Sequence, residues 1–167
     1  MGICMKLRDL QAKDISFMFE WMHDDFVVHY LKQDFTKKKI EDCIKFIELA
    51  QDKSENIHLA IVDDFDEYMG TVSLKNLNQN TAEFAIVLRS CAMGGGFANF
   101  AMNEIFEYGY KNYGIEIVYW CVNIENRRAL NFYDKYKYHR SEIPIQAIGY
   151  TEEEEQNYIW YCTKIIC

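Results

Sequence analysis

The chain has 167 residues, of which 50% are hydrophobic and 26% are charged, and its formal net charge is −8. This length and composition suit one folded domain over residues 1–167 and exclude a disordered chain. A strongly acidic protein lacks the basic face that binds phosphate backbones, so the charge argues against a nucleic-acid partner. No stretch reaches the roughly 20 apolar residues that span a bilayer, so we expect no membrane association.

The N-terminal segment and the cysteines both indicate a cytoplasmic protein. Residues 1–13 carry charge from Lys6 onward and contain no apolar signal-peptide core. The six cysteines form no C-x-x-C pair, and no histidine cluster lies near them at zinc-binding spacing. Cys43, Cys121 and Cys162 fall inside apolar periodic runs, where small buried hydrophobic residues fit. We therefore predict neither a metal site nor a disulfide framework.

The first half of the chain predicts a strand, two helices and a meander of strands. Residues 6–10 form the strand, and a helix opens at Asp14 and is followed by further helical turns over 24–31. Thr36 is the expected N-cap of the second helix, which extends to about residue 51. Strands then follow over residues 57–62, 68–74 and 81–88, and the short polar turns between them predict antiparallel pairing.

The second half alternates helices and strands before a closing hairpin. The apolar pattern predicts helices over 97–113 and 126–136, with Gly114 capping the first of them. Strands are expected over residues 115–122, 138–145 and 157–165, and the acidic run 151–156 is expected to be a loop. The crossover from 81–88 through a helix to 115–122 makes these two strands parallel neighbours.

Three consecutive glycines form the most informative feature of the sequence. Gly94, Gly95 and Gly96 lie between a predicted strand and a predicted helix. A turn without side chains can curl so that its N–H groups point into one concavity, and the helix N-terminus adds positive charge. Such a turn suits a pyrophosphate, although it could equally be a flexible connection. It is neither a P-loop, because no Lys-Ser/Thr follows, nor a G-x-G-x-x-G fingerprint, which makes an ATP-binding protein a poor alternative.

This segment resembles the coenzyme-binding motif R/Q-x-x-G-x-G/A of the GNAT acetyltransferases. Gly96 and Ala98 match its two small positions. Gly94 matches the first glycine of the G-x-G-x-A form found in the branch that modifies ribosomal protein N-termini. Met93, however, stands where Arg or Gln is usual, and Gly95 replaces a commonly basic residue. Backbone N–H groups must therefore carry more of the phosphate binding.

A second segment, residues 122–138, is similar to the family's V-x-x-x-N-x-x-A-x-x-x-Y-x-K-x-G-F. The residues that fit are Asn126, Ala129, Tyr133, Lys135 and Tyr138, whereas Lys137 stands where glycine is usual. The order of elements agrees as well, so the resemblance covers nearly the whole chain. It implies the α/β GNAT fold: a mixed, mostly antiparallel sheet of about six to seven strands, with splayed fourth and fifth strands and four or so flanking helices.

The resemblance implies that acetyl-CoA, without a metal, binds between the splayed strands and that an amine attacks it directly. Tyr133 resembles the family's general acid, with a core tyrosine as the alternative. Glu83 is the candidate general base, unless it faces solvent; His23, His29 and His58 are weaker candidates. Asn126 is expected to cap its helix, to contact the coenzyme, or to do both. The residues implied to contact the coenzyme are Ile86, Val87, Leu88, Met93, Gly94, Gly95, Gly96, Phe97, Ala98, Asn126 and Ala129.

The acceptor amine stays open at this stage. In this family the N-terminal helices and the final hairpin shape the acceptor pocket. The N-terminal region resembles the branches that acetylate ribosomal protein N-termini and amino sugars on nucleotide carriers, so a small-molecule amine, an amino sugar, an aminoglycoside and a protein N-terminus are all compatible. A non-catalytic acyl-CoA-binding GNAT-like module is the alternative, favoured by the departures at Met93, Gly95 and Lys137. The aromatic content also allows a homodimer.

Overall fold

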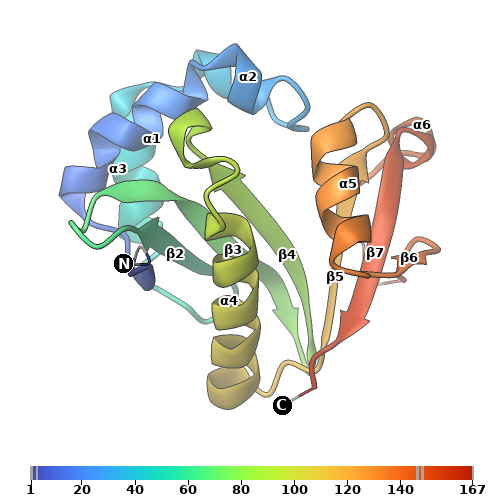
Figure 1. Ribbon diagram of the computed structural model, residues 1–167. Coiled ribbons are helices and arrows are strands. Elements are labelled where there is room, and N and C mark those ends of the chain that lie inside the picture. The colour runs from blue at the N-terminus through green and yellow to red at the C-terminus, as the bar shows by residue number, and fades with distance from the viewer. Residues whose placement is uncertain (1, 3, 146, 148, 167) are drawn as a thin grey trace.

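A seven-stranded mixed sheet organises the fold in the computed structural model, which describes residues 2, 4–145, 147 and 149–166 (Figure 1). The strands, in the order β1-β2-β3-β4-β5-β7-β6 across the sheet, are β1 (Lys6–Asp9), β2 (Ile57–Val62), β3 (Tyr68–Asn78), β4 (Thr81–Leu88), β5 (Ile117–Asn123), β6 (Arg140–Ser141) and β7 (Tyr158–Lys164). The helices are α1 (Ile15–Met22), α2 (Asp25–Val28), α3 (Ile40–Leu49), α4 (Phe97–Tyr113), α5 (Arg127–Lys135) and α6 (Glu152–Gln156). Among the residues described, no helix combines the length and the apolar character needed to cross a membrane.

The pairing of the strands confirms the predicted fold class. Strands β1 to β4 form an antiparallel meander, and α4 connects β4 to β5 as parallel neighbours. Strand β7 then pairs antiparallel with β5, and the short strand β6 pairs with β7 at the edge. The sheet is therefore mixed and mostly antiparallel, as the order of elements and the polar turns predict.

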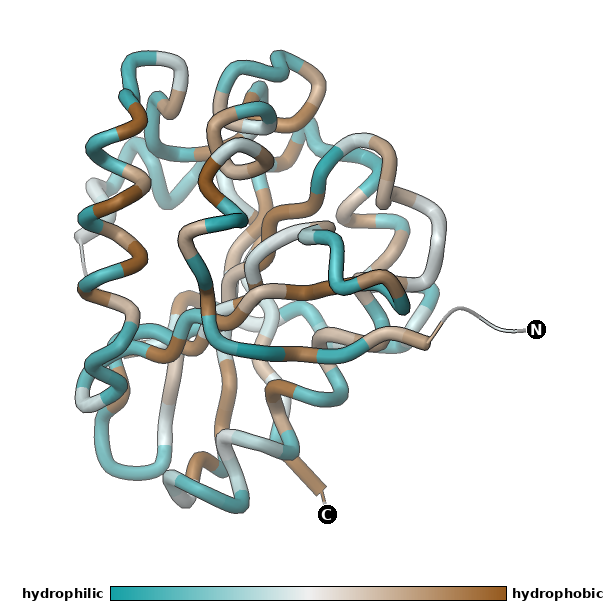
Figure 2. The backbone as a smooth tube through the Cα atoms, turned by 90° about the vertical axis from the view of Figure 1, so that its left-hand side faces the viewer, coloured by the Kyte–Doolittle hydropathy of each residue, from teal (hydrophilic) through white to brown (hydrophobic). Residues whose placement is uncertain are grey.

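Helices cover both faces of this sheet, and α1, α3, α4 and α5 bury apolar residues against it. Helix α4 buries Ala101, Met102, Ile105 and Phe106 in a core that also includes residues of α5. Helices α1 and α3 pack in a second core, against β2 and the start of β3. The hydrophobic residues recur along the coils of the helices, whereas much of the connecting chain is hydrophilic (Figure 2). Gly114, at φ +67°, ends α4 in the left-handed conformation that glycine tolerates.

Two predicted helix boundaries near the N-terminus are wrong. The helical turns expected over 24–31 are limited to α2, which Asp24 caps by accepting from the Phe26 N–H. Thr36 does not cap α3, because Asp34 accepts hydrogen bonds from both its N–H and its hydroxyl and holds it in a 3-10 turn. Helix α3 begins at Ile40, after an extended Lys39.

Two further corrections concern the C-terminal hairpin. The strand expected over 138–145 is reduced to the two residues of β6; Pro144, which has no N–H to donate, cannot extend its ladder. The acidic run expected to be a loop forms α6. Thr151 accepts from the Glu154 N–H and Glu154 accepts from the Thr151 N–H, which is a capping box. Acidic side chains in a first helical turn also interact favourably with the helix dipole.

Candidate active site

The site lies where β4 and β5 separate. These strands pair only over Thr81↔Ile117, Ala82↔Val118 and Glu83↔Tyr119, whereas β4 stays paired with β3 up to Leu88 and β5 stays paired with β7 up to Asn123. The strands diverge beyond that point (Figure 1), and a cleft of about 450 Å³ lies between them. Alternate backbone N–H and C=O groups along each wall therefore face the cleft without a strand partner.

Side chains from both faces of the sheet line the cleft, because they alternate along each wall. Phe84 and Trp120 point toward α4 and α5, with their ring centroids 5.6 Å apart, and fill the base of the gap on that side. Glu83 and Cys121 both line the cleft from the opposite face, the face on which Lys75 pairs in register with Glu83. A reactant held on one face can therefore meet a second reactant from the other.

The glycine turn forms one end of the cleft. Gly94 and Gly96 have φ angles of +79° and +85°, a left-handed conformation that favours glycine. Gly94 lines the cleft, and Gly95 and Gly96 are exposed beside it at the start of α4. Phe97 is 5% exposed and packs into the core, so its predicted coenzyme contact can involve only its backbone. Of the residues predicted to contact the coenzyme, the cleft is lined by Ile86, Val87, Leu88, Met93, Gly94, Ala98, Asn126 and Ala129.

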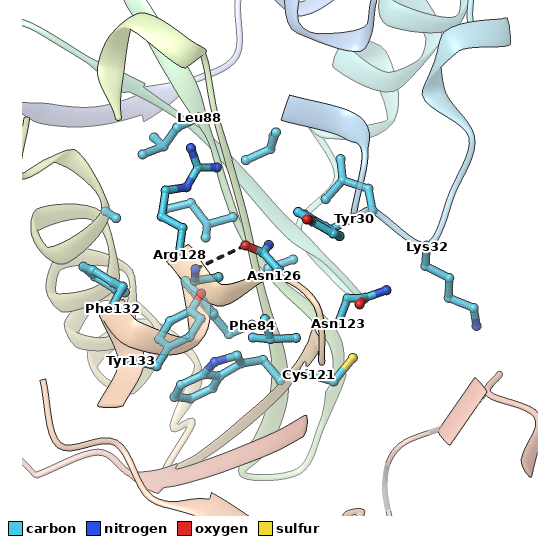
Figure 3. A pocket seen from close by; sticks show the side chains of 18 of the residues that line it. Tyr30, Lys32, Phe84, Leu88, Cys121, Asn123, Asn126, Arg128, Phe132 and Tyr133 are labelled. Carbon is cyan, nitrogen blue, oxygen red and sulfur yellow. Dashed lines mark hydrogen bonds between the residues drawn. The ribbon is translucent and has the colours of Figure 1, made fainter. Parts of the chain in front are cut away.

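Asn126 both caps α5 and lines the cleft. Its side-chain oxygen accepts a hydrogen bond from the Ala129 N–H at 3.2 Å, which caps α5. The same residue lines the cleft, and Figure 3 shows it near the middle of the cavity with the capping bond drawn. Capping orients the side chain, so its amide stays beside the path of a bound ligand.

Tyr133 lines the cleft from α5. Its ring is 6% exposed and lies 5.3 Å from Trp120 and 5.2 Å from Tyr161 by centroid distance. Figure 3 shows its hydroxyl end directed toward the N-terminal end of α5, where Asn126 lies. Burial raises the pKa of this phenol well above its ordinary value, and the neighbouring Tyr161 and Tyr138 add to the effect. The phenol therefore keeps its proton at neutral pH, as a general acid must.

Glu83 lies on the other face, at the last paired position of β4 and β5. Its side chain is 8% exposed, so it does not point to solvent. The Asn76 Nδ2 donates to its Oε2 at 2.9 Å, and the Lys75 Nζ lies 3.4 Å from its Oε1. Each carboxylate oxygen retains a free lone pair, because one oxygen can accept two hydrogen bonds. Asn76 and Lys75 thus hold the Glu83 carboxylate in place at the base of the cleft.

The sequence reasoning missed the residues that line the cleft on the Glu83 side. Tyr30 and Lys32 come from the loop after α2, Lys75 from β3, and Tyr150 and Tyr158 from the C-terminal segment. The Lys32 Nζ lies 3.8 Å from the centroid of the Tyr150 ring and 3.6 Å from Glu154. No spacing or motif joins these positions in the sequence, so only the fold brings them together.

Cys121 lies among these residues, and its Sγ is 3.3 Å from the Tyr150 hydroxyl. Burial raises the pKa of the Cys121 thiol to about 11. A nucleophilic cysteine needs its thiolate, which this pKa suppresses at neutral pH. The environment of Cys121 therefore argues against a covalent acyl-enzyme.

The candidate histidines lie elsewhere. His58 bonds to the Ser73 hydroxyl at 2.7 Å and packs on the Phe46 ring, and burial lowers its pKa to about 4. The His23 Nδ1 lies 2.9 Å from the Phe19 carbonyl oxygen in α1. Neither of these, nor His29, is among the described residues that line the cleft. Within the described ranges, no group of three or more His, Cys, Asp or Glu residues could hold a metal ion.

Comparison with known proteins identifies the family. The family model for the acetyltransferase (GNAT) domain matches residues 5–139. The chain is 24% identical to acetyltransferase PseH of Campylobacter jejuni over 76% of its own length and 78% of that protein, and 26% identical to spermidine N(1)-acetyltransferase of Escherichia coli K12 over 78% and 70%. Spermidine N-acetyltransferase from Vibrio cholerae, solved with CoA and spermine, has the same fold, with a TM-score of 0.79 at 17% identity over 96% and 95% of the chains. The chain belongs to the GNAT acetyltransferase family and is an N-acetyltransferase that uses acetyl-CoA.

Proposed function

We propose that the protein transfers the acetyl group of acetyl-CoA to a primary amine by direct attack in a ternary complex inside the β4–β5 cleft. The observation that carries this proposal is the placement of Glu83 and Tyr133 on opposite faces of the sheet, both lining the same opening. The pantetheine arm lies between the strands, and its thioester faces the backbone of Ile86, Val87 and Leu88. The amine enters from the Glu83 side.

The reaction needs a base for the attacking amine and an acid for the departing thiolate, and Glu83 and Tyr133 fill these two roles. An alkylamine has a pKa near ~10.4, so only about one in ~2,500 is unprotonated at pH 7. Glu83 accepts this proton, directly or through one water. As the C–S bond breaks, the departing thiolate takes a proton from Tyr133. The attacking nitrogen loses its second proton as the amide forms, and this proton restores the Tyr133 phenol through solvent. The rest of the rate enhancement comes mainly from holding the amine and the thioester in line, because orientation can lower the activation barrier by roughly 7–11 kcal/mol.

The side chains around Glu83 favour an amino sugar on a nucleotide carrier as the acceptor. The described residues lining this end include two lysines, Lys32 and Lys75, and a single carboxylate, Glu83. A polyamine carries several ammonium groups, and two nearby lysines repel them. A nucleotide-linked sugar instead carries phosphates that lysines attract. The rings of Tyr30, Tyr150 and Tyr158 supply flat apolar faces and hydroxyls for a sugar or a base.

A polyamine is the second candidate. The observation in its favour is α6, which places Glu152, Glu153, Glu154 and Glu155 in one turn, with Glu154 beside Lys32 at the cleft. These glutamates could hold an ammonium group outside the cleft. Two acetyltransferases similar to this chain are named for spermidine.

Steady-state kinetics separate the two acceptors. We expect kcat/KM for a nucleotide-linked amino sugar with a free amine to exceed that for spermidine by at least about 10-fold, because Lys32 and Lys75 contribute charge-assisted bonds worth roughly 1.5–3 kcal/mol each. Lys32→Glu should narrow or reverse this preference. Lys37→Glu is the matched control, because Lys37 is 85% exposed and lies outside the cleft. A wild-type preference for spermidine would overturn the acceptor assignment, and no thiol release with any amine would favour the non-catalytic module.

A further inference from the structure

Arg128, the second residue of α5, reaches from the far wall of the cleft to the glycine turn. Its guanidinium Nη1 donates to the Met93 Sδ, and its Cζ lies 4.7 Å from the centroid of the Phe26 ring. Figure 3 shows the side chain extending toward Leu88, the last residue of β4. Arg128 is therefore held between α5, α2 and the turn, with its charged end over the residues predicted to meet the coenzyme's phosphates.

The contact with Met93 leaves the Arg128 guanidinium available for a ligand. Met93 stands where this family's motif usually has Arg or Gln, so the turn lacks its own polar side chain for the phosphates. A methionine sulfur is only a weak hydrogen-bond acceptor, so it leaves the donor capacity of the guanidinium largely unused. Arginine presents five N–H donors in a planar fork that matches phosphate oxygens.

The other cations in this region interact with other groups. Arg89, four residues before Met93, is 8% exposed, and Glu20 and Glu67 both accept hydrogen bonds from it. Lys32 and Lys75 line the cleft too, but they lie near Tyr150 and Glu83. Of the described cations that line the cleft, Arg128 is the one that hydrogen-bonds to Met93, the residue directly before the glycine turn.

We infer that Arg128 binds the pyrophosphate of acetyl-CoA, and supplies from α5 the charge that the turn lacks at position 93. This inference rests on the proposed function, because it assumes that the coenzyme's phosphates lie at the glycine turn. The guanidinium leaves Met93 and turns its fork onto the phosphates, while the N–H groups of the turn bind the opposite oxygens. Arg128 is a coenzyme-binding residue and takes no part in proton transfer.

The test compares two donors that differ in their phosphates, acetyl-CoA and acetyl-pantetheine. We expect Arg128→Ala to raise the Kd for acetyl-CoA about 10- to 100-fold, the range that corresponds to loss of a charge-assisted hydrogen bond, and to leave the affinity for acetyl-pantetheine unchanged. Arg127→Ala is the matched control: Arg127 is the preceding arginine of the same helix and, like Arg128, is exposed, but it does not line the cleft. It should change neither affinity more than about twofold, within the range of an exposed charge.

A second variant tests whether position 93 and Arg128 exchange roles. Adding Met93→Arg to Arg128→Ala should restore most of the acetyl-CoA affinity, because the charge then comes from the turn itself. Equal acetyl-CoA affinities for Arg128→Ala and Arg127→Ala would overturn the inference and leave the proposed function standing. An equal loss for acetyl-pantetheine would also overturn it, since that result indicates a structural role. Failure of the wild-type protein to bind acetyl-CoA would instead contradict the proposed function.

Discussion

Replacement of Tyr133 by phenylalanine is expected to lower kcat by about 10² or more, the size of contribution that a positioned general acid makes. The ring contacts with Trp120 and Tyr161 remain in this variant, so the fold and the acetyl-CoA affinity should be preserved. The thiolate would then leave without a proton donor. Stopped-time assays of thiol release at saturating acetyl-CoA and amine measure the effect directly.

Tyr136→Phe is the matched control for this prediction. Tyr136 follows α5, is 42% exposed and is absent from the described cleft lining. The Tyr136→Phe variant should have the kcat of the wild-type protein. Because burial raises the Tyr133 pKa, we also expect no loss of wild-type activity from phenol ionisation up to pH ~10. Unchanged turnover in Tyr133→Phe would mean that Tyr133 is a core tyrosine and that the acid lies elsewhere.

Replacement of Glu83 by glutamine should produce a comparable loss that depends on pH. Glutamine keeps an oxygen for the Asn76 amide but cannot accept the proton of the ammonium. We expect kcat/KM at pH 7 to fall about 10² or more. The loss of activity in the variant should become smaller as the pH rises. Below the pKa of the amine, each increase of one pH unit raises the fraction of unprotonated amine about tenfold, so less depends on the base.

Glu116→Gln is the control for the loss of one carboxylate. Glu116 is an exposed residue that accepts from Asn80 at 3.1 Å and is not part of the described cleft lining. It should leave the pH profile unchanged. If Glu83→Gln lowers activity by the same factor at every pH, Glu83 positions the acceptor or the strands and is not the base.

The elements that form the coenzyme end could be predicted closely from the sequence. Strand β4 and helix α4 have the predicted bounds, because their hydrophobic periods are strong and glycines or polar turns end them. The glycine turn and Asn126 each belong to a contiguous segment whose local geometry follows from its own residues. The local sequence therefore predicted the strand, the turn and the helix at this end of the cleft.

The acceptor end could not be predicted in the same way. Lys32, Lys75 and Tyr150 belong to three distant segments, and Lys32 reaches Tyr150 across more than a hundred residues of chain. Their proximity follows from how the α2 loop and the C-terminal segment pack beside the separated strands. Likewise, Arg127 and Arg128 look equivalent in the sequence, and only the direction of α5 shows that Arg128 faces the glycine turn.

The most direct test of the central claim, that the β4–β5 cleft holds acetyl-CoA, is the melting temperature of the purified protein with acetyl-CoA and, separately, with ATP. A ligand at about 100 times its Kd stabilises a protein by roughly 2.7 kcal/mol. For a chain of this length that corresponds to a rise of about 5–10 °C. We predict this rise with acetyl-CoA and none with ATP, which has phosphates but no pantetheine arm. No rise with saturating acetyl-CoA, or an equal rise with ATP, would contradict the assignment of the cleft.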